Sequence, residues 1–130
     1  MSGFFDTNIL VYAQERGRKG DQARALFQRG GKLSVQVLNE FTAVSRRKQR
    51  RDWSEIAEAI SDVLAVVDAP VGLTLDLHRT ARRIAEDHGL SFYDALIVAA
   101  ALEAGCDTLY SEDLQHGRKF GRLTIVNPFV

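Results

Sequence analysis

The sequence has 130 residues, 45% of them hydrophobic and 26% charged, which suits one globular domain over residues 1–130. Seventeen basic and seventeen acidic residues cancel, so net charge predicts no polyanionic partner. The single cysteine excludes an intrachain disulfide framework and a cysteine-based zinc site. The longest apolar run, 95–102, is far shorter than the ~20 residues that span a bilayer, and no signal-peptide pattern opens the chain. We therefore expect a cytoplasmic protein without a membrane segment.

The first half of the chain alternates strand-like and helix-like segments. The opening "GFFD" is short and apolar before its acid, and the spacing of Val37, Phe41 and Val44 is helical. Gly30 and Gly31 provide a helix stop. We expect, in order, a strand at 3–6, helices at 8–14 and 21–30, a strand at 32–35 ("KLSV") and a helix at 35–50.

Capping residues organise the second half. Asp52 with Glu55 three residues later resembles a capping box, and Thr74 and Ser91 are suitable N-caps. We expect helices at 53–67, 75–89 and 95–105, and strands at 107–111 and 123–127. The alternation of strands and helices predicts an α/β fold with a mostly parallel central sheet flanked by helices.

Four acids occupy positions that are unusual for solvated charges. Asp6 closes the first strand, Glu40 lies at the edge of an apolar helix face, Asp94 opens an apolar helix, and Asp113 follows a predicted strand. Each has a structural alternative: Asp6 and Asp94 suit helix starts, Glu40 could reach solvent at a boundary, and Asp113 could be a turn residue. No Lys, Arg or His occurs among the first fifteen residues to pair with Asp6.

The four acids together suggest a metal site. Each comes at, or within two turns after, the expected carboxyl end of a strand, and these ends share one edge of a parallel sheet. Carboxylates held close together repel one another, and a divalent cation removes that conflict. Oxygen ligands without cysteine or clustered histidine favour Mg²⁺ or Mn²⁺ over Zn²⁺. Phosphodiester hydrolysis is the reaction class that such a site supports.

A nuclease also needs cations for the phosphate backbone. The segment "RRKQRR" carries five positive charges in six residues, at Arg46, Arg47, Lys48, Arg50 and Arg51. A solvated helix end is the structural alternative for this cluster.

Four segments, "FFDTNILVYA", "LSVQVLNEF", "SFYDALIVAAA" and "LYSEDLQHG", together resemble the motifs of PIN domains, in order and at family spacing. The chain is most similar to the ribonuclease toxins of toxin–antitoxin pairs (VapC-like). The resemblance implies a Mg²⁺- or Mn²⁺-dependent endoribonuclease that forms a homodimer and is silenced by a cognate antitoxin protein. By motif position, the catalytic and metal-binding acids would be Asp6, Glu40, Asp94 and Asp113, oriented by Thr7, Asn8 and Ser111.

One position departs from the family pattern. Many relatives carry a further acid two residues after the equivalent of Asp113, where this chain has Gln115. Glu112, which we expect to be solvated, is a weak substitute for that acid. The alternative function is a PIN-like module that binds a metal or a partner without cleaving RNA.

Overall fold

The computed structural model describes residues 3–130. Its strands are β1 (Gly3–Phe5), β2 (Thr108–Tyr110), β3 (Lys119–Phe120) and β4 (Leu123–Val126). Its helices are α1 (Thr7–Ala13), α2 (Arg18–Gln28), α3 (Val35–Arg47), α4 (Trp53–Leu64), α5 (Leu75–His88) and α6 (Phe92–Glu103).

The four strands form one sheet in the order β1-β2-β4-β3. β1 pairs in parallel with β2, and β2 in parallel with β4, whereas β3 pairs antiparallel with β4. The predicted α/β fold with a mostly parallel sheet is therefore confirmed. Phe5 faces Tyr110 in the β1–β2 register, so both strands end at the same edge. The residues that follow them, Asp6 and Ser111, consequently lie side by side.

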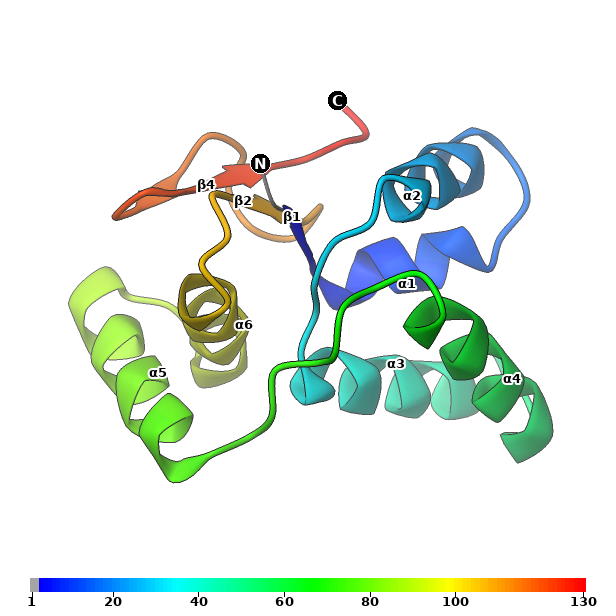
Figure 1. Cartoon of the computed structure of the whole chain (residues 1–130), viewed down its shortest axis with the longest axis horizontal. Helices are drawn as coiled ribbons and strands as arrows, with labels where there is room; N and C mark the ends of the chain where they lie inside the picture. Colours follow the sequence, from blue (N-terminus) through cyan, green and yellow to red (C-terminus); the bar gives the residue numbers. More distant parts are fainter. Residues whose placement is uncertain (1–2) are drawn as a thin grey trace.

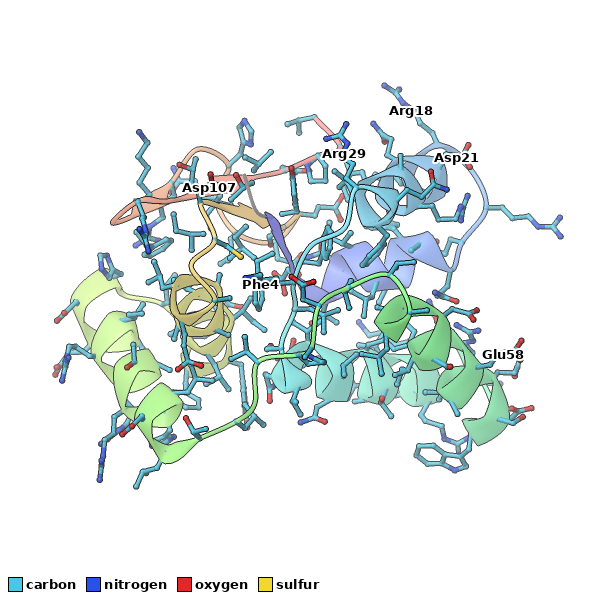
Figure 2. The ribbon with its side chains drawn as sticks, viewed as in Figure 1. Phe4, Arg18, Asp21, Arg29, Glu58 and Asp107 are labelled. Carbon is cyan, nitrogen blue, oxygen red and sulfur yellow. The ribbon has the colours of Figure 1, made fainter. Side chains whose placement is uncertain are left out.

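The helices divide into two groups around the sheet (Figure 1). α5 and α6 pack against each other at one end of the molecule, and α1 packs against both α2 and α3 at the other. Figure 2 places Phe4 in the interior and the charged side chains of Arg18, Arg29 and Glu58 at the periphery. From Ala95 to Ala101, helix α6 is apolar on all sides and every residue is buried, as expected for a helix inside the core.

The three predicted N-caps are confirmed, although α2 and α6 each begin three residues earlier than predicted. Asp52 and Glu55 form the capping box of α4, with each side chain accepting a hydrogen bond from the other residue's backbone amide. Thr74 caps α5, which ends at Gly89 with φ of 68°, a left-handed conformation that favours glycine. The Ser91 hydroxyl accepts a hydrogen bond from the Asp94 amide at 3.3 Å and caps α6.

One predicted strand is wrong, and one strand of the structure was not predicted. "KLSV" does not form a full strand: Lys32 makes an isolated bridge to Phe4, and Ser34 makes one to Val71. Ser34 already caps α3 by accepting a hydrogen bond from the Val37 amide, which leaves too few residues for an extended segment. The short antiparallel strand β3 was not predicted, because two residues carry too little pattern to reveal a strand.

Within residues 3–130, none of the helices combines the length and the apolar character needed to cross a membrane.

Candidate functional site

Asp6 lies at the centre of the carboxyl edge of the sheet. Its side chain is 5% exposed, and its backbone amide donates to the Tyr110 carbonyl at 3.0 Å, which continues the β1–β2 pairing by one step. The Oδ1 atom accepts from the Thr7 amide at 2.7 Å, so Asp6 is also the N-cap of α1. The Oδ2 atom accepts from the Ser111 hydroxyl at 2.7 Å. The capping alternative for Asp6 is therefore true of the structure, and it leaves a carboxylate buried at the strand end.

The environment of Asp6 disfavours its negative charge. Burial raises the pKa of the Asp6 carboxyl from 3.8 to about 6, with Asp113 and Glu40 adding repulsion. The hydrogen bonds from Ser111 and Thr7 act in the opposite direction and lower the pKa in part. None of the ion pairs among residues 3–130 involves Asp6, Glu40 or Asp113. The carboxylate thus lies in a site with an excess of negative charge.

Ser111 is fully buried and organises the loop that carries Asp113. Its hydroxyl donates to Asp6, and it accepts from the backbone amides of Asp113 and Leu114, each at 3.2 Å. One hydroxyl therefore uses its donor and both acceptor positions at the junction between β2 and the following loop.

Replacement of Ser111→Ala is expected to destabilise the fold by about 2 kcal/mol, because it leaves two backbone amides without their acceptor. Urea unfolding of the two proteins gives the difference. Ser45→Ala is a matched control, since the Ser45 hydroxyl is equally buried and has no hydrogen-bond partner within residues 3–130. A Ser111→Ala protein as stable as Ser45→Ala would contradict the role of Ser111.

Two polar residues of α1 link Asp6 to more distant acids. The Thr7 hydroxyl donates to Glu40 Oε1 at 3.0 Å, and Gln36 donates to Glu40 Oε2 at 2.8 Å. The Asn8 side-chain amide donates to Asp113 Oδ2 at 3.1 Å. Consecutive residues after β1 thus bring α3 and the loop after β2 to the same edge. Gln36 was not predicted as part of the site; its position one turn before Glu40 was the available signal.

Asp94 is placed differently from the other three acids. It does not follow a strand, because α6 comes directly after α5. The sequence argument that each acid follows a strand was therefore wrong for Asp94, and also for Glu40, because residues 32–35 before α3 do not form a strand. The Asp94 amide is bonded to the Ser91 cap, but its carboxylate has no hydrogen bond or ion pair within the described residues. The structure therefore connects Asp6, Glu40 and Asp113 through side-chain contacts and charge, and gives no such contact for Asp94.

A cavity of about 550 Å³ adjoins the acids and receives part of the basic cluster. Glu40, Asp113, Arg47 and Lys48 are among the residues that line it. The other basic residues of 46–51 are not among them. Arg46 lies over the Trp53 ring at 4.5 Å and donates to the Arg51 carbonyl.

Arg51 and Arg50 differ from Arg47 and Lys48 in their surroundings. Arg51 donates to the Gln14 side chain at 3.4 Å. Arg50 is exposed and has a φ of 52°, in the left-handed region. The predicted cluster is therefore split, with two of its five residues at the acidic cavity.

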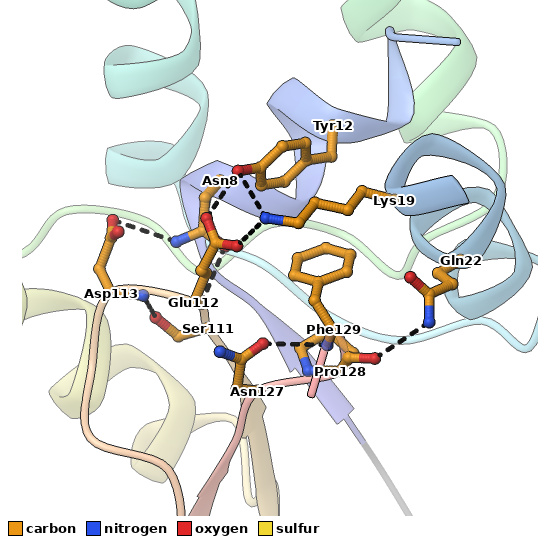
Figure 3. Close-up of polar contacts among 10 residues, drawn as sticks. All are labelled: Asn8, Tyr12, Lys19, Gln22, Ser111, Glu112, Asp113, Asn127, Pro128 and Phe129. Atoms are coloured by element: carbon orange, nitrogen blue, oxygen red, sulfur yellow. Dashed lines mark hydrogen bonds and ion pairs between the residues drawn. The ribbon is translucent and has the colours of Figure 1, made fainter. Parts of the chain in front are cut away.

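Glu112 is paired rather than solvated, contrary to expectation. Its carboxylate accepts from the Tyr12 hydroxyl at 2.6 Å and from Lys19 Nζ at 2.5 Å (Figure 3). The hydrogen bond from Lys19, and to a smaller extent that from Tyr12, holds the pKa of Glu112 below its usual range. The hydrogen bond to Glu112 raises the pKa of Tyr12. Sequence reasoning missed Tyr12 and Lys19, because they lie about a hundred residues away in the chain.

The donor chemistry of the edge fits a hard divalent cation. Its acids offer oxygen atoms alone, and the buried Asp6 carboxylate has an unfavourable charge that a cation would neutralise. Within residues 3–130, no three His, Cys, Asp or Glu side chains are arranged so that they could hold an ion directly. The acids are instead linked indirectly, through side-chain hydrogen bonds that Thr7 donates to Glu40, Asn8 to Asp113 and Ser111 to Asp6.

These features define an α/β protein with buried and partly buried carboxylates at the carboxyl edge of its sheet, beside a cavity with a basic wall. The chain belongs to the PIN domain family, whose model matches residues 3–120. This confirms the resemblance drawn from the four sequence motifs. No curated protein matches the sequence significantly.

Solved structures agree with this family. VapC20 of Mycobacterium tuberculosis, described as a toxin that cleaves the sarcin–ricin loop, is 24% identical with a TM-score of 0.68, covering 86% of this chain and 90% of its own. A toxin–antitoxin complex from Klebsiella pneumoniae is 18% identical with a TM-score of 0.72, covering 98% of each chain. VapBC2 of Rickettsia felis, bound to promoter DNA, is 19% identical with a TM-score of 0.67, covering 96% and 97%. At these identities the likeness concerns the fold.

Proposed function

We propose that the protein is a Mg²⁺- or Mn²⁺-dependent endoribonuclease and the toxin of a toxin–antitoxin pair. One observation carries the proposal: the buried Asp6 carboxylate is repelled by the charges of Glu40 and Asp113 at the edge where β1 and β2 end. A structural N-cap needs only one acid, whereas a buried acid repelled by two further acids is costly to fold without a cation.

Asp6, Glu40 and Asp113 are the residues that would hold the ion, in part through bound water, since no three acids among residues 3–130 are arranged to contact it together. Such an ion lowers the pKa of a bound water and neutralises charge on the phosphate. Thr7 orients Glu40, Asn8 orients Asp113, and Ser111 orients Asp6 through the hydrogen bonds described above. Asp94 remains a proposed fourth acid by its motif position alone.

The basic wall of the cavity would bind the substrate's phosphate groups. We expect Arg47→Gln with Lys48→Gln to weaken RNA binding by about tenfold and to flatten its dependence on salt, because each phosphate contact releases counterions. Fluorescence anisotropy at several salt concentrations measures both effects. Arg18→Gln with Arg29→Gln removes the same charge from the first residue and the C-cap of α2 and is the control (Figure 2). Equal losses in the two double variants would contradict a binding role specific to this cavity.

The catalytic proposal is tested by incubating the protein with a pool of structured and single-stranded RNAs. Separate reactions contain Mg²⁺, Mn²⁺ or EDTA. We expect cleavage with either metal and none with EDTA. Metal binding without cleavage of any RNA would instead support the alternative, a PIN-like module that does not cleave.

The proposed partners are a cognate antitoxin protein and a second copy of this chain. Support for the antitoxin comes from two similar structures, which contain a toxin–antitoxin complex and VapBC2. The homodimer rests on the family resemblance. Light scattering of the purified protein would measure its mass in solution, and a mass near 14.5 kDa would contradict the homodimer.

A further inference from the structure

Glu112 is fixed at both its side chain and its backbone. Each carboxylate oxygen has its own donor, with the Tyr12 hydroxyl on Oε1 and Lys19 Nζ on Oε2. The Glu112 amide donates to Asn8 Oδ1 at 3.1 Å. The other end of the same Asn8 amide donates to Asp113 at 3.1 Å. Figure 3 shows these contacts as one connected chain from Lys19 to Asp113.

The last residues of the chain cover this network. The Phe129 and Tyr12 rings meet edge-on, with their centres 4.9 Å apart. Lys19 Nζ lies 5.3 Å from the centre of the Phe129 ring. Phe129 is held by a hydrogen bond from its amide to the Asn127 side chain at 2.9 Å. Lys19 also lies over the Tyr12 ring at 4.8 Å. Two aromatic rings thus flank the ammonium group that pairs with Glu112.

These contacts direct the Glu112 carboxylate to α1 and α2, while its neighbour Asp113 contacts Asn8. Glu112 already has a cationic partner in Lys19, whereas Asp6, Glu40 and Asp113 have no ion pair among residues 3–130, so Glu112 is the acid least prepared to bind a further cation. It can, however, fix the backbone of the loop that presents Asp113, as outer residues commonly do around metal ligands.

We propose that Glu112 is a positioning residue, held by Tyr12 and Lys19, that sets Asn8 and Asp113 for the reaction. It is not a substitute for the acid that the family pattern lacks at Gln115. This inference rests on the proposed function. The fixing of the loop by the network, however, is a property of the metal-free protein.

Tyr12→Phe is the decisive variant, because it removes one hydrogen bond without changing charge and keeps the ring that contacts Lys19 and Phe129. In the metal-free protein, we expect hydrogen exchange of the Glu112 amide to accelerate by about fivefold or more, measured by NMR. The Asn8 side-chain amide signals should shift as well. Tyr93→Phe is the control, since Tyr93 is an exposed tyrosine with no hydrogen bond at its hydroxyl within residues 3–130.

Mn²⁺ affinity, measured by calorimetry, separates positioning from direct ligation. We expect Tyr12→Phe and Glu112→Gln each to weaken Mn²⁺ binding by about tenfold, the lower end of outer-residue effects. If Glu112 were a ligand, Tyr12→Phe would free its carboxylate and leave binding equal or tighter, while Glu112→Gln would abolish it. That pattern would overturn the proposal.

A purely structural role predicts a lower melting temperature with unchanged exchange at Glu112 and unchanged Mn²⁺ affinity, which would also overturn it. If the wild-type protein bound no Mn²⁺, the proposed function would fail and Glu112 would lose its role in that reaction. The exchange rates would still show whether the network fixes the loop, so the two failures are distinguishable.

Discussion

Asp6→Asn is expected to lower the rate of metal-dependent RNA cleavage by about 100- to 1,000-fold, the usual loss when one electrostatic group is removed from an active site. Asparagine is as good an N-cap as aspartate, so α1 should still begin at Thr7. What the variant loses is the negative charge at the centre of the acidic edge. Initial rates on the RNA that the wild type cleaves best give the comparison.

Asp107→Asn is the matched control for this experiment. Asp107 is an exposed acid that immediately precedes β2, so the same substitution is made at the opposite end of the neighbouring strand (Figure 2). The control should cleave at the wild-type rate. An Asp6→Asn protein that is folded and fully active would show that Asp6 is only a helix cap.

The second large effect concerns stability and pH. Burial raises the pKa of Asp6 in the folded protein to about 6, against 3.8 in the unfolded chain. Asp6 therefore contributes stability that is fully present below about pH 4 and is lost as the pH rises through 6. A difference of about two pKa units corresponds to about 3 kcal/mol.

Asp6→Asn isolates this contribution, because asparagine does not titrate. In EDTA, the unfolding free energy of the wild type minus that of the variant should fall by up to about 3 kcal/mol between pH 4 and pH 8, as urea unfolding would show. The variant also places an amide donor opposite the Ser111 hydroxyl, which already accepts two backbone amides. That cost is constant with pH and does not affect the slope.

Adding Mg²⁺ at pH 8 should stabilise the wild type and leave Asp6→Asn unchanged, since binding to the folded state adds to its stability. A free-energy difference that rises with pH would mean that the hydrogen bonds from Ser111 and Thr7 outweigh burial. Asp6 would then be a satisfied anion without need of a cation.

The sequence predicted the parts of the site that depend on strand ends. Asp6 comes directly after β1, and Asp113 lies in the loop after β2, so the parallel pairing of these strands suffices to bring the two regions together. Glu40 was found from its position at the edge of an apolar helix face, and it proved to be bonded to Thr7. The capping residues Asp52, Thr74 and Ser91 were recognisable because a cap is a local pattern.

The remaining features depend on contacts that local patterns do not encode. The pairing of Glu112 with Lys19 and Tyr12 joins residues about a hundred positions apart. The split of the basic cluster depends on tertiary contacts: of two consecutive residues of α3, Arg46 lies over the Trp53 ring, whereas Arg47 lines the cavity. Asp94 was assigned by its motif, although the helix before it, not a strand, sets its position.

The most direct test of the account is to locate a bound Mn²⁺ by its paramagnetic broadening of NMR signals. At less than one equivalent of Mn²⁺, signals from residues 6–8, 40 and 111–113 should broaden first in the wild type and not in Asp6→Asn. Broadening of 93–95 in the same titration would add Asp94 to the site. Uniform broadening, or broadening confined to a surface away from Asp6, would contradict a metal site at the carboxyl edge of the sheet.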